Sequence, residues 1–147
     1  MNSGLAALRA VLPSELSTAG RKMRTVFDRL VRARGLTLTR ARTLMLLAHD
    51  SEMTQKDLAA ALDVEHPTLV RVLDGLEKQG LIERCAVDGD RRAKRIALTP
   101  ASEGQIRELE DLSEVVREQM LEGIPEEDVA TALRVLRRIG ENLDRVP

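Results

Sequence analysis

The chain has 147 residues, of which 43% are hydrophobic and 32% are charged, a composition that supports a packed domain and excludes bulk disorder. A single aromatic residue, Phe27, and a single cysteine, Cys85, argue against base-stacking platforms for single strands, internal disulfides and thiolate-rich metal cages. The formal net charge of −1 gives no general attraction for nucleic acid. The sequence has no run of 18 apolar residues, which excludes a membrane-spanning helix, so a cytoplasmic protein is expected.

The N-terminal segment is predicted to form one long helix and one short helix. Apolar residues recur every three or four positions between Ser14 and Arg34, the spacing of an amphipathic helix, and Gly35 is a suitable stop. The second helix is expected to have Thr39 as its N-cap and to end near His49.

A helix–turn–helix is predicted from Thr54 onwards. Thr54 opens the run TQKDLAAAL, and Asp57 follows three residues later, which is the spacing of a capping box. A tight break is expected at residues 63–64, and Pro67 then begins a second helix that ends just before Gly80. Two short helices joined by such a turn are typical of DNA-binding domains.

Two short strands are predicted after this motif. The runs LIERCA (81–86) and KRIAL (94–98) are separated by a polar, glycine-containing loop, VDGDRRA (87–93). Together they would form a two-stranded wing, in which Ile96 and Leu98 pack against the body of the domain while the loop projects from it.

Two further helices are predicted at the C-terminal end. Thr99 and Pro100 supply an N-cap and a first-turn residue for a long helix to about Glu122, and Pro125 begins the last helix. The expected apolar stripes are Ile106, Leu109, Leu112, Val116 and Met120 on the first of these, and Val129, Ala132, Leu133, Leu136, Ile139 and Leu143 on the second.

The predicted fold is therefore mainly α (α+β), with a winged helix–turn–helix between helical extensions. We expect an N-terminal dimerisation helix in residues 1–38, a DNA-binding domain in 39–99 and C-terminal dimerisation helices in 100–147. The end segments carry apolar stripes with no partner in the middle segment, so they are expected to pack on one another and on a second copy of the chain.

The charges are distributed unevenly along the chain. Residues 84–95 hold five cations and two anions, a sum of +5 − 2 = +3, whereas residues 100–128 hold two cations and ten anions, a sum of +2 − 10 = −8. Attraction to phosphate depends on the local field, so this polarity favours a molecule that presents one basic face to DNA.

The second helix of the helix–turn–helix has the pattern of a recognition helix. Its buried side is expected to hold Leu69, Val72, Leu73 and Leu76, and its opposite side is short and polar, which suits a major groove about 12 Å wide. Arg71 can reach a guanine edge or a phosphate, and the helix N-terminus attracts phosphate. A solvated amphipathic helix is the alternative interpretation. The predicted contacts from the two helices are Thr54, Gln55, Glu65, His66, Pro67, Thr68 and Arg71.

The predicted wing adds a second set of contacts. The spacing of Asp90 and Arg92 allows the carboxylate to hold the guanidinium or cap the turn, which leaves Arg91 or Arg92 free to enter a narrow minor groove. Lys94 and Arg95 flank the tip and can neutralise phosphates. The predicted wing contacts are Arg84, Asp90, Arg91, Arg92, Lys94 and Arg95.

These residues also carry a family resemblance. The run DRRAKRIALT resembles the wing signature D-x-R-x5-L-T of MarR-type transcription regulators, which Asp90, Arg92, Leu98 and Thr99 match. The run VEHPTLVRVLDGLEKQGLIER resembles the recognition helix and following strand of that family, in particular its SlyA-like branch. The specific likeness covers residues 39–99.

The resemblance implies a homodimeric regulator of transcription that binds a pseudo-palindromic, double-stranded DNA operator through Arg71 and the wing arginines. It also implies a small phenolic or aromatic carboxylate effector in the crevice between the dimerisation helices and the DNA-binding lobe. No motif identifies the residues of that pocket. No cofactor is expected.

The sequence also allows other interpretations. Cys85 in the first wing strand could act as a redox switch, although a packed or idle thiol is favoured because a buried strand position hinders reactivity. His49 and His66 lack the companions that a metal site needs, and no catalytic motif is present, so neither a metal site nor an enzyme is expected. A winged-helix module that binds another protein is the remaining alternative.

Overall fold

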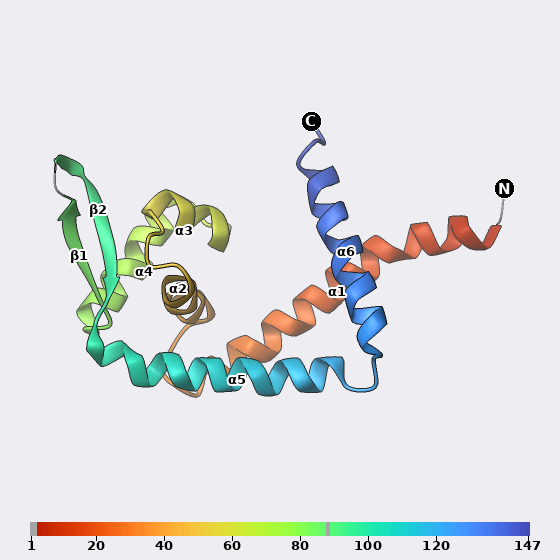
Figure 1. The fold of residues 1–147 in the computed structure, drawn as a ribbon, viewed down its shortest axis with the longest axis horizontal. Coiled ribbons are helices and arrows are strands. Elements are labelled where there is room, and N and C mark those ends of the chain that lie inside the picture. Colours follow the sequence, from red (N-terminus) through yellow and green to blue (C-terminus); the bar gives the residue numbers. More distant parts are fainter. Residues whose placement is uncertain (1–2, 88) are drawn as a thin grey trace. The chain divides into compact units, whose positions relative to one another are not determined.

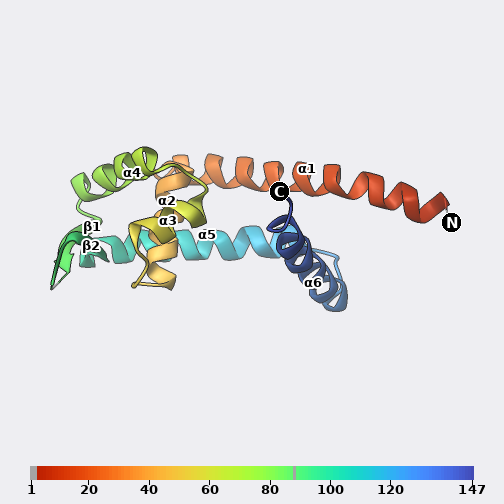
Figure 2. The ribbon, with the colours of Figure 1, turned by 90° about the horizontal axis from the view of Figure 1, so that it is seen from above.

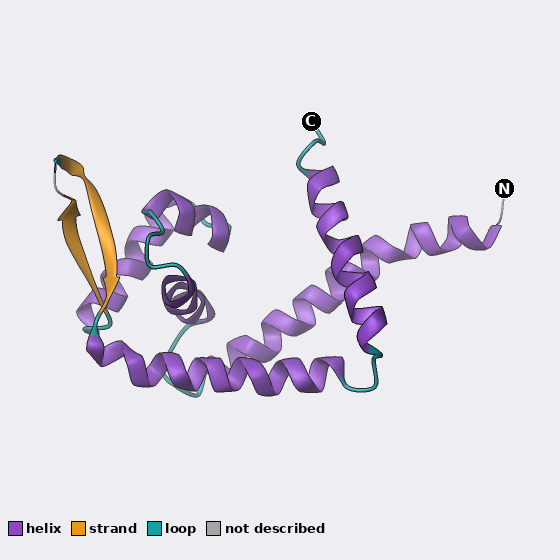
Figure 3. Ribbon diagram, in the orientation of Figure 1, coloured by secondary structure: helices purple, strands orange, loops and turns teal. Residues whose placement is uncertain are grey.

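A computed structural model describes residues 3–87 and 89–147, with the side chains of residue 87 and residues 90–93 left out of the description. The chain is mainly helical with one two-stranded antiparallel sheet, as predicted (Figures 1 and 3). Its elements are α1 (Ser3–Arg32), α2 (Leu38–His49), α3 (Gln55–Leu62), α4 (His66–Lys78), β1 (Ile82–Val87), β2 (Asp90–Leu98), a 3-10 turn (Pro100–Ser102), α5 (Glu103–Leu121) and α6 (Glu126–Leu143).

The chain divides into two compact units, Met1–Glu110 and Asp111–Pro147. The first unit contains α1 to β2 and the start of α5, and the second contains the rest of α5 and α6. The division into the segments 1–38, 39–99 and 100–147 stays a prediction.

Helix α1 is longer at its N-terminal end than the sequence pattern predicted. It begins at Ser3, not at Ser14, and Pro13 lies inside it. Proline inside a helix removes one amide hydrogen bond and crowds the preceding turn, yet α1 continues on both sides of Pro13. The helix ends at Arg32, and Gly35 in the following turn has a φ of 75°, a left-handed conformation that glycine adopts without strain.

Helix α2 starts two residues earlier than expected. Its N-cap is Thr37, whose hydroxyl accepts a hydrogen bond from the Arg40 amide at 3.2 Å, and not Thr39. The carbonyl of Thr39 accepts a hydrogen bond from the buried Thr43 hydroxyl at 2.8 Å, within the helix. The predicted end at His49 is confirmed.

The helix–turn–helix follows the predicted signals closely. The Thr54 hydroxyl accepts from the Asp57 amide and the Asp57 carboxylate accepts from the Thr54 amide, both at 3.1 Å, so the capping box is confirmed. These hydrogen bonds from Thr54 hold the pKa of Asp57 below its ordinary value. The break falls at Asp63, which has a left-handed φ of 53°, and Pro67 lies in the first turn of α4.

Helices α2, α3 and α4 pack together around an aliphatic core (Figures 1 and 2). Core side chains come from all three helices, from the end of α1, from both strands and from the start of α5. Many leucines compensate for the scarcity of aromatic residues. Val72, predicted on the buried side of α4, is only half-buried. The fully buried large side chains of this unit include Leu44, Leu47, Leu58, Leu69, Leu73, Leu76, Ile82, Ile96 and Leu109.

The wing strands are longer than predicted, and the connection between them is shorter. Strand β1 runs to Val87 and strand β2 begins at Asp90, so most of the predicted loop 87–93 belongs to the strands. Gly89 lies in the turn with a φ of 89°, and residue 88 is outside the described residues. The register pairs Val87 with Asp90 and Ala86 with Lys94, so the shift between these pairs falls at residues 91–93 of β2. The inward packing of Ile96 is confirmed, and Leu98 is half-buried.

Helix α6 begins next to Pro125 as predicted, whereas α5 begins at Glu103 and the predicted first turn at Pro100 is a 3-10 turn. The Thr99 hydroxyl, however, donates to the Gly80 carbonyl at 2.5 Å instead of capping the 3-10 turn that precedes α5. The predicted stripe of α5 is buried from Ile106 to Val116, but Met120 is exposed. No residue of α6 is buried. No helix among the described residues is long and apolar enough to cross a membrane.

Candidate nucleic-acid interface

The N-terminal half of α4 presents a polar, exposed surface. Glu65, the N-cap, and His66, Pro67, Thr68 and Arg71 are all exposed, whereas Leu69 on the opposite side is fully buried. No side chain caps the first-turn amides of α4, so these N–H groups can receive an external acceptor. Among the described residues, Arg71 forms no ion pair. This end of α4 therefore offers hydrogen-bond donors and the guanidinium of Arg71 to a ligand.

The predicted contacts at the start of α3 are partly engaged within the protein. Thr54 is exposed, but its hydroxyl and amide are both engaged in the capping box with Asp57. Gln55 is half-buried in the first turn. Both residues belong to the same small unit as α4, and the proposal that they contact DNA rests on that placement.

The exposed cations of the wing lie on β2. Lys94 and Arg95 are exposed, and Arg95 donates to a carboxylate oxygen of Glu52 at 2.8 Å. Both partners of this ion pair are more than half exposed, so it contributes little stability and can be exchanged for a phosphate. The side chains of Asp90, Arg91 and Arg92 lie outside the described residues, and their backbone forms the first three positions of β2 next to the turn.

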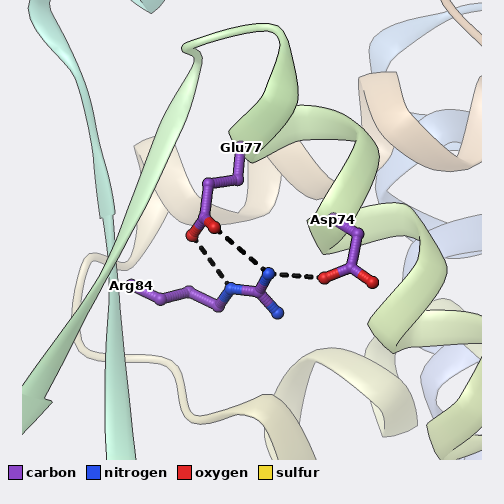
Figure 4. Close-up of polar contacts among 3 residues, drawn as sticks. All are labelled: Asp74, Glu77 and Arg84. Carbon is purple, nitrogen blue, oxygen red and sulfur yellow. Dashed lines mark hydrogen bonds and ion pairs between the residues drawn. The ribbon is translucent and has the colours of Figure 1, made fainter.

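Arg84 has a different environment from the other predicted contacts. Its Nε donates to Glu77 Oε2 at 3.0 Å and its Nη2 to Glu77 Oε1 at 3.3 Å, while Nη2 also pairs with Asp74 (Figure 4). The hydrogen bonds to Glu77, and then those to Asp74, raise the pKa of Arg84, and the bonds from Arg84 lower the pKa of Glu77. The guanidinium is therefore committed within the protein, which disfavours the predicted role of Arg84 in contacting DNA directly.

Arg40 is a cation beside the recognition helix that the sequence interpretation missed. A Cβ atom built on Gly75 of α4 would lie 2.2 Å from Arg40 Nη2. The guanidinium of Arg40, which comes from α2, therefore occupies the space that any larger side chain at position 75 would need. The signal in the sequence is a glycine in the middle of a helix, where alanine is favoured by about 1 kcal/mol unless another group approaches closely. Gly75 lies about one turn after Arg71 on α4, so Arg40 adds a positive charge near that surface.

The remaining candidates from the sequence do not form a site. Cys85 is exposed, so it is not the packed thiol that was one of the two favoured interpretations, and whether it is idle stays a prediction. Its cross-strand neighbour is Arg95. Within residues 3–87 and 89–147, no group of three or more His, Cys, Asp or Glu side chains is arranged to hold a metal ion. His49 is exposed at the end of α2.

Comparisons with known proteins identify the architecture. A model of the MarR family matches residues 34–93. The crystal structure of transcriptional regulator PA3341 is 42% identical over 92% of this chain and 99% of that one, with a TM-score of 0.85. A MarR-family transcriptional regulator from Silicibacter pomeroyi is 25% identical over 100% of this chain and 99% of that one, with a TM-score of 0.82.

A complex of S. aureus MepR with DNA shares the fold, with 23% identity over 88% of this chain and 96% of that one, and a TM-score of 0.79. None of these similarities distinguishes the SlyA-like branch, which stays a prediction. The family match covers the helix–turn–helix and the tip of the wing, and the strongest of these similarities extends over nearly the whole chain. The chain therefore belongs to the MarR family of winged-helix transcriptional regulators.

Proposed function

We propose that this chain regulates transcription in the cytoplasm as a homodimer that binds a pseudo-palindromic operator in double-stranded DNA. The observation that supports this most directly is the combination of an uncapped, exposed N-terminal half of α4 with a basic antiparallel wing on the same compact unit. A helix of this kind fits the major groove, and a two-stranded arm beside it fits the adjacent minor groove.

The recognition helix supplies the proposed base contacts. Arg71 is exposed and has the reach for a bidentate bond to guanine O6 and N7, and Thr68 lies one turn earlier on the same side. His66 and the free first-turn amides of α4 are suited to a backbone phosphate. The proposed surface also includes Glu65, Pro67, Thr54 and Gln55, whose contacts would fix the position and orientation of the two helices on the duplex.

The wing supplies the proposed minor-groove and phosphate contacts. Arg91 and Arg92 stand next to the turn of the hairpin, where an arginine can enter a narrow A·T-rich minor groove. Asp90 would hold or orient one of them. Lys94 and Arg95 lie farther along β2 and would neutralise phosphates, with Arg95 exchanging Glu52 for DNA.

The homodimer is proposed because the helical extensions expose many large apolar side chains. Monomeric proteins seldom expose contiguous apolar surface on this scale. In α1 the residues recur at helical spacing, and α6 has no buried residue of its own. A second copy of the chain would cover these surfaces under two-fold symmetry. The exposed residues are Leu5, Leu8, Val11, Leu12, Leu16 and Met23 in α1, and Val115, Met120, Ile124, Leu133, Val135, Leu136, Leu143 and Val146 in the C-terminal part.

Selection of binding sites from a pool of random duplexes tests the proposal. We expect the purified chain to enrich two inverted half-sites whose centres are about one helical turn, roughly 10–10.5 base pairs, apart. A variant with Leu133→Glu and Leu136→Glu on α6 should lose this symmetric site, because charges in the proposed interface oppose association. Enrichment of an isolated half-site by the wild type would contradict the dimer, and no enrichment would contradict DNA binding.

We also propose that a small aromatic carboxylate or phenol modulates DNA binding, on the basis of family membership. Such a ligand acts only if it prefers a state in which the two recognition helices no longer fit adjacent grooves. Titration of salicylate-like acids and simple phenols into a complex with a selected duplex is expected to release DNA for at least one compound. Unchanged affinity across the whole set would contradict this proposal.

A further inference from the structure

Arg84 connects two elements that the proposed function uses separately. The residue lies in β1 of the wing, and both of its partners, Asp74 and Glu77, lie in α4 (Figure 4). We call these three residues the Arg84 cluster. Arg84 is paired across the sheet with the buried Ile96, which places it on the inward face of the wing. Its side chain is 18% exposed, far less than those of the two carboxylates.

The Arg84 cluster spans the turn that joins the recognition helix to the wing. Asp74 and Glu77 precede Gly80, which has a φ of 74°, and Arg84 follows it. On the other strand, the Thr99 hydroxyl donates to the carbonyl of the same glycine. Glycine by itself permits many directions for the chain that follows it. The Arg84 cluster and the hydrogen bond from Thr99 therefore restrict the direction in which the wing leaves α4 at Gly80.

Small rotations at this turn have large effects at the wing tip. Six strand residues span about 20 Å, so a rotation of about 10° at Gly80 would move the tip by about 3.5 Å. That displacement exceeds the tolerance of a hydrogen bond or of an arginine in a narrow groove. The position of Arg91 and Arg92 relative to Arg71 depends on how firmly the turn is held.

The charge of the cluster argues against a role as a phosphate contact. One guanidinium and two carboxylates sum to +1 − 2 = −1, so the group repels DNA at long range. Arg84 would have to give up the bidentate bond to Glu77 and the bond to Asp74 to reach a phosphate, leaving two carboxylates unpaired. A cluster of net negative charge beside a DNA-binding surface is better explained by a role in orienting the wing than by contact with DNA.

We propose that Arg84 is a positioning residue for DNA recognition: by binding Asp74 and Glu77 it fixes the wing relative to the recognition helix, so that major-groove and minor-groove contacts form together. The inference rests on the proposed DNA-binding function. Asp74, Glu77 and Arg84 then affect DNA affinity through the orientation of the wing and not through direct contact with DNA.

The sign of the change in affinity tests the proposal. The double variant Asp74→Asn and Glu77→Gln removes two negative charges, so simple electrostatics would strengthen binding to a selected duplex. We expect it instead to weaken binding by about tenfold, the equivalent of one lost groove contact. Arg84→Lys keeps the charge but cannot form the bidentate bond, and a smaller loss is expected. Glu83→Gln is the matched control: this exposed residue of the same strand pairs across the sheet with Ala97, and its change should leave affinity equal or higher.

A double-mutant cycle separates positioning from general destabilisation. In the wild type, Arg91→Ala should weaken binding strongly, whereas in the Asp74→Asn and Glu77→Gln background its effect should be at least about threefold smaller, because a displaced tip has less contact to lose. Thermal unfolding of each variant verifies that it is folded at the temperature of the assay.

Two outcomes would overturn the proposal. One is equal or tighter binding by the folded Asp74→Asn and Glu77→Gln variant. The other is full additivity with Arg91→Ala. Absence of duplex binding by the wild-type chain would instead contradict the proposed function itself, so the two failures are distinguishable.

Discussion

Replacing Arg91 and Arg92 with alanine is expected to weaken binding to every duplex, and most of all to operators with A·T-rich flanks. Each arginine would lose charge-assisted hydrogen bonds worth about 1.5–3 kcal/mol. The larger loss on A·T-rich flanks is expected because a narrow minor groove concentrates negative potential. Fluorescence anisotropy with duplexes that share half-sites but differ in their flanks measures both effects, for the single and double variants.

The control for the wing prediction is Arg107→Ala. Arg107 is exposed on α5, outside the helix–turn–helix and the wing, so its loss removes the same charge without removing a proposed contact. Arg107→Ala should therefore change affinity far less than either wing variant. Equal affinity of the wild type, Arg91→Ala and Arg92→Ala would refute the role of the wing.

Replacing Arg71 with alanine is expected to cost about 1–3 kcal/mol of binding free energy and to relax sequence preference at one position in each half-site. The physical reason is the loss of a bidentate bond to a guanine edge, which no neighbouring side chain of α4 replaces. Binding of the variant to a panel of duplexes with each base at each half-site position measures both the loss and its dependence on sequence.

Lys78→Ala provides the comparison on the same helix. Lys78 is exposed at the C-terminal end of α4, away from the N-terminal half that is proposed to enter the major groove. Its replacement should lower affinity slightly and uniformly. If Arg71→Ala also lowers affinity by the same factor on all sequences, Arg71 contacts phosphate only, and base recognition must come from other residues.

The sequence predicted those parts of the fold that are determined by local chemistry. The capping box of Thr54 and Asp57, the break at Asp63 and the glycine stop at Gly80 are all short-range signals, and each lies where it was expected. Boundaries were wrong where a competing signal was present. The predicted start at Ser14 lies inside α1, which begins at Ser3, and Thr39 resembled an N-cap although Thr37 fills that role.

Two features of the candidate site, the environment of Arg84 and the place of Arg40, could not be predicted from the sequence for the same physical reason. Arginine looks the same in a sequence whether it faces solvent, DNA or two carboxylates, and the pairing of Arg84 with Asp74 and Glu77 depends on tertiary contact between α4 and β1. The same applies to Arg40, whose place beside Gly75 depends on the packing of α2 against α4. The polar run at residues 90–93 was interpreted as a loop from its low strand propensity, whereas its backbone lies in β2, at the register shift.

The salt dependence of binding to a selected duplex tests DNA recognition by this chain most directly. If two subunits neutralise about six phosphates between them, the logarithm of the association constant should fall linearly with the logarithm of salt concentration, with a slope of about −5. Anisotropy titrations between about 50 and 200 mM salt would measure this slope. A slope near zero would contradict recognition of the phosphate backbone and would favour a winged-helix module that binds another protein.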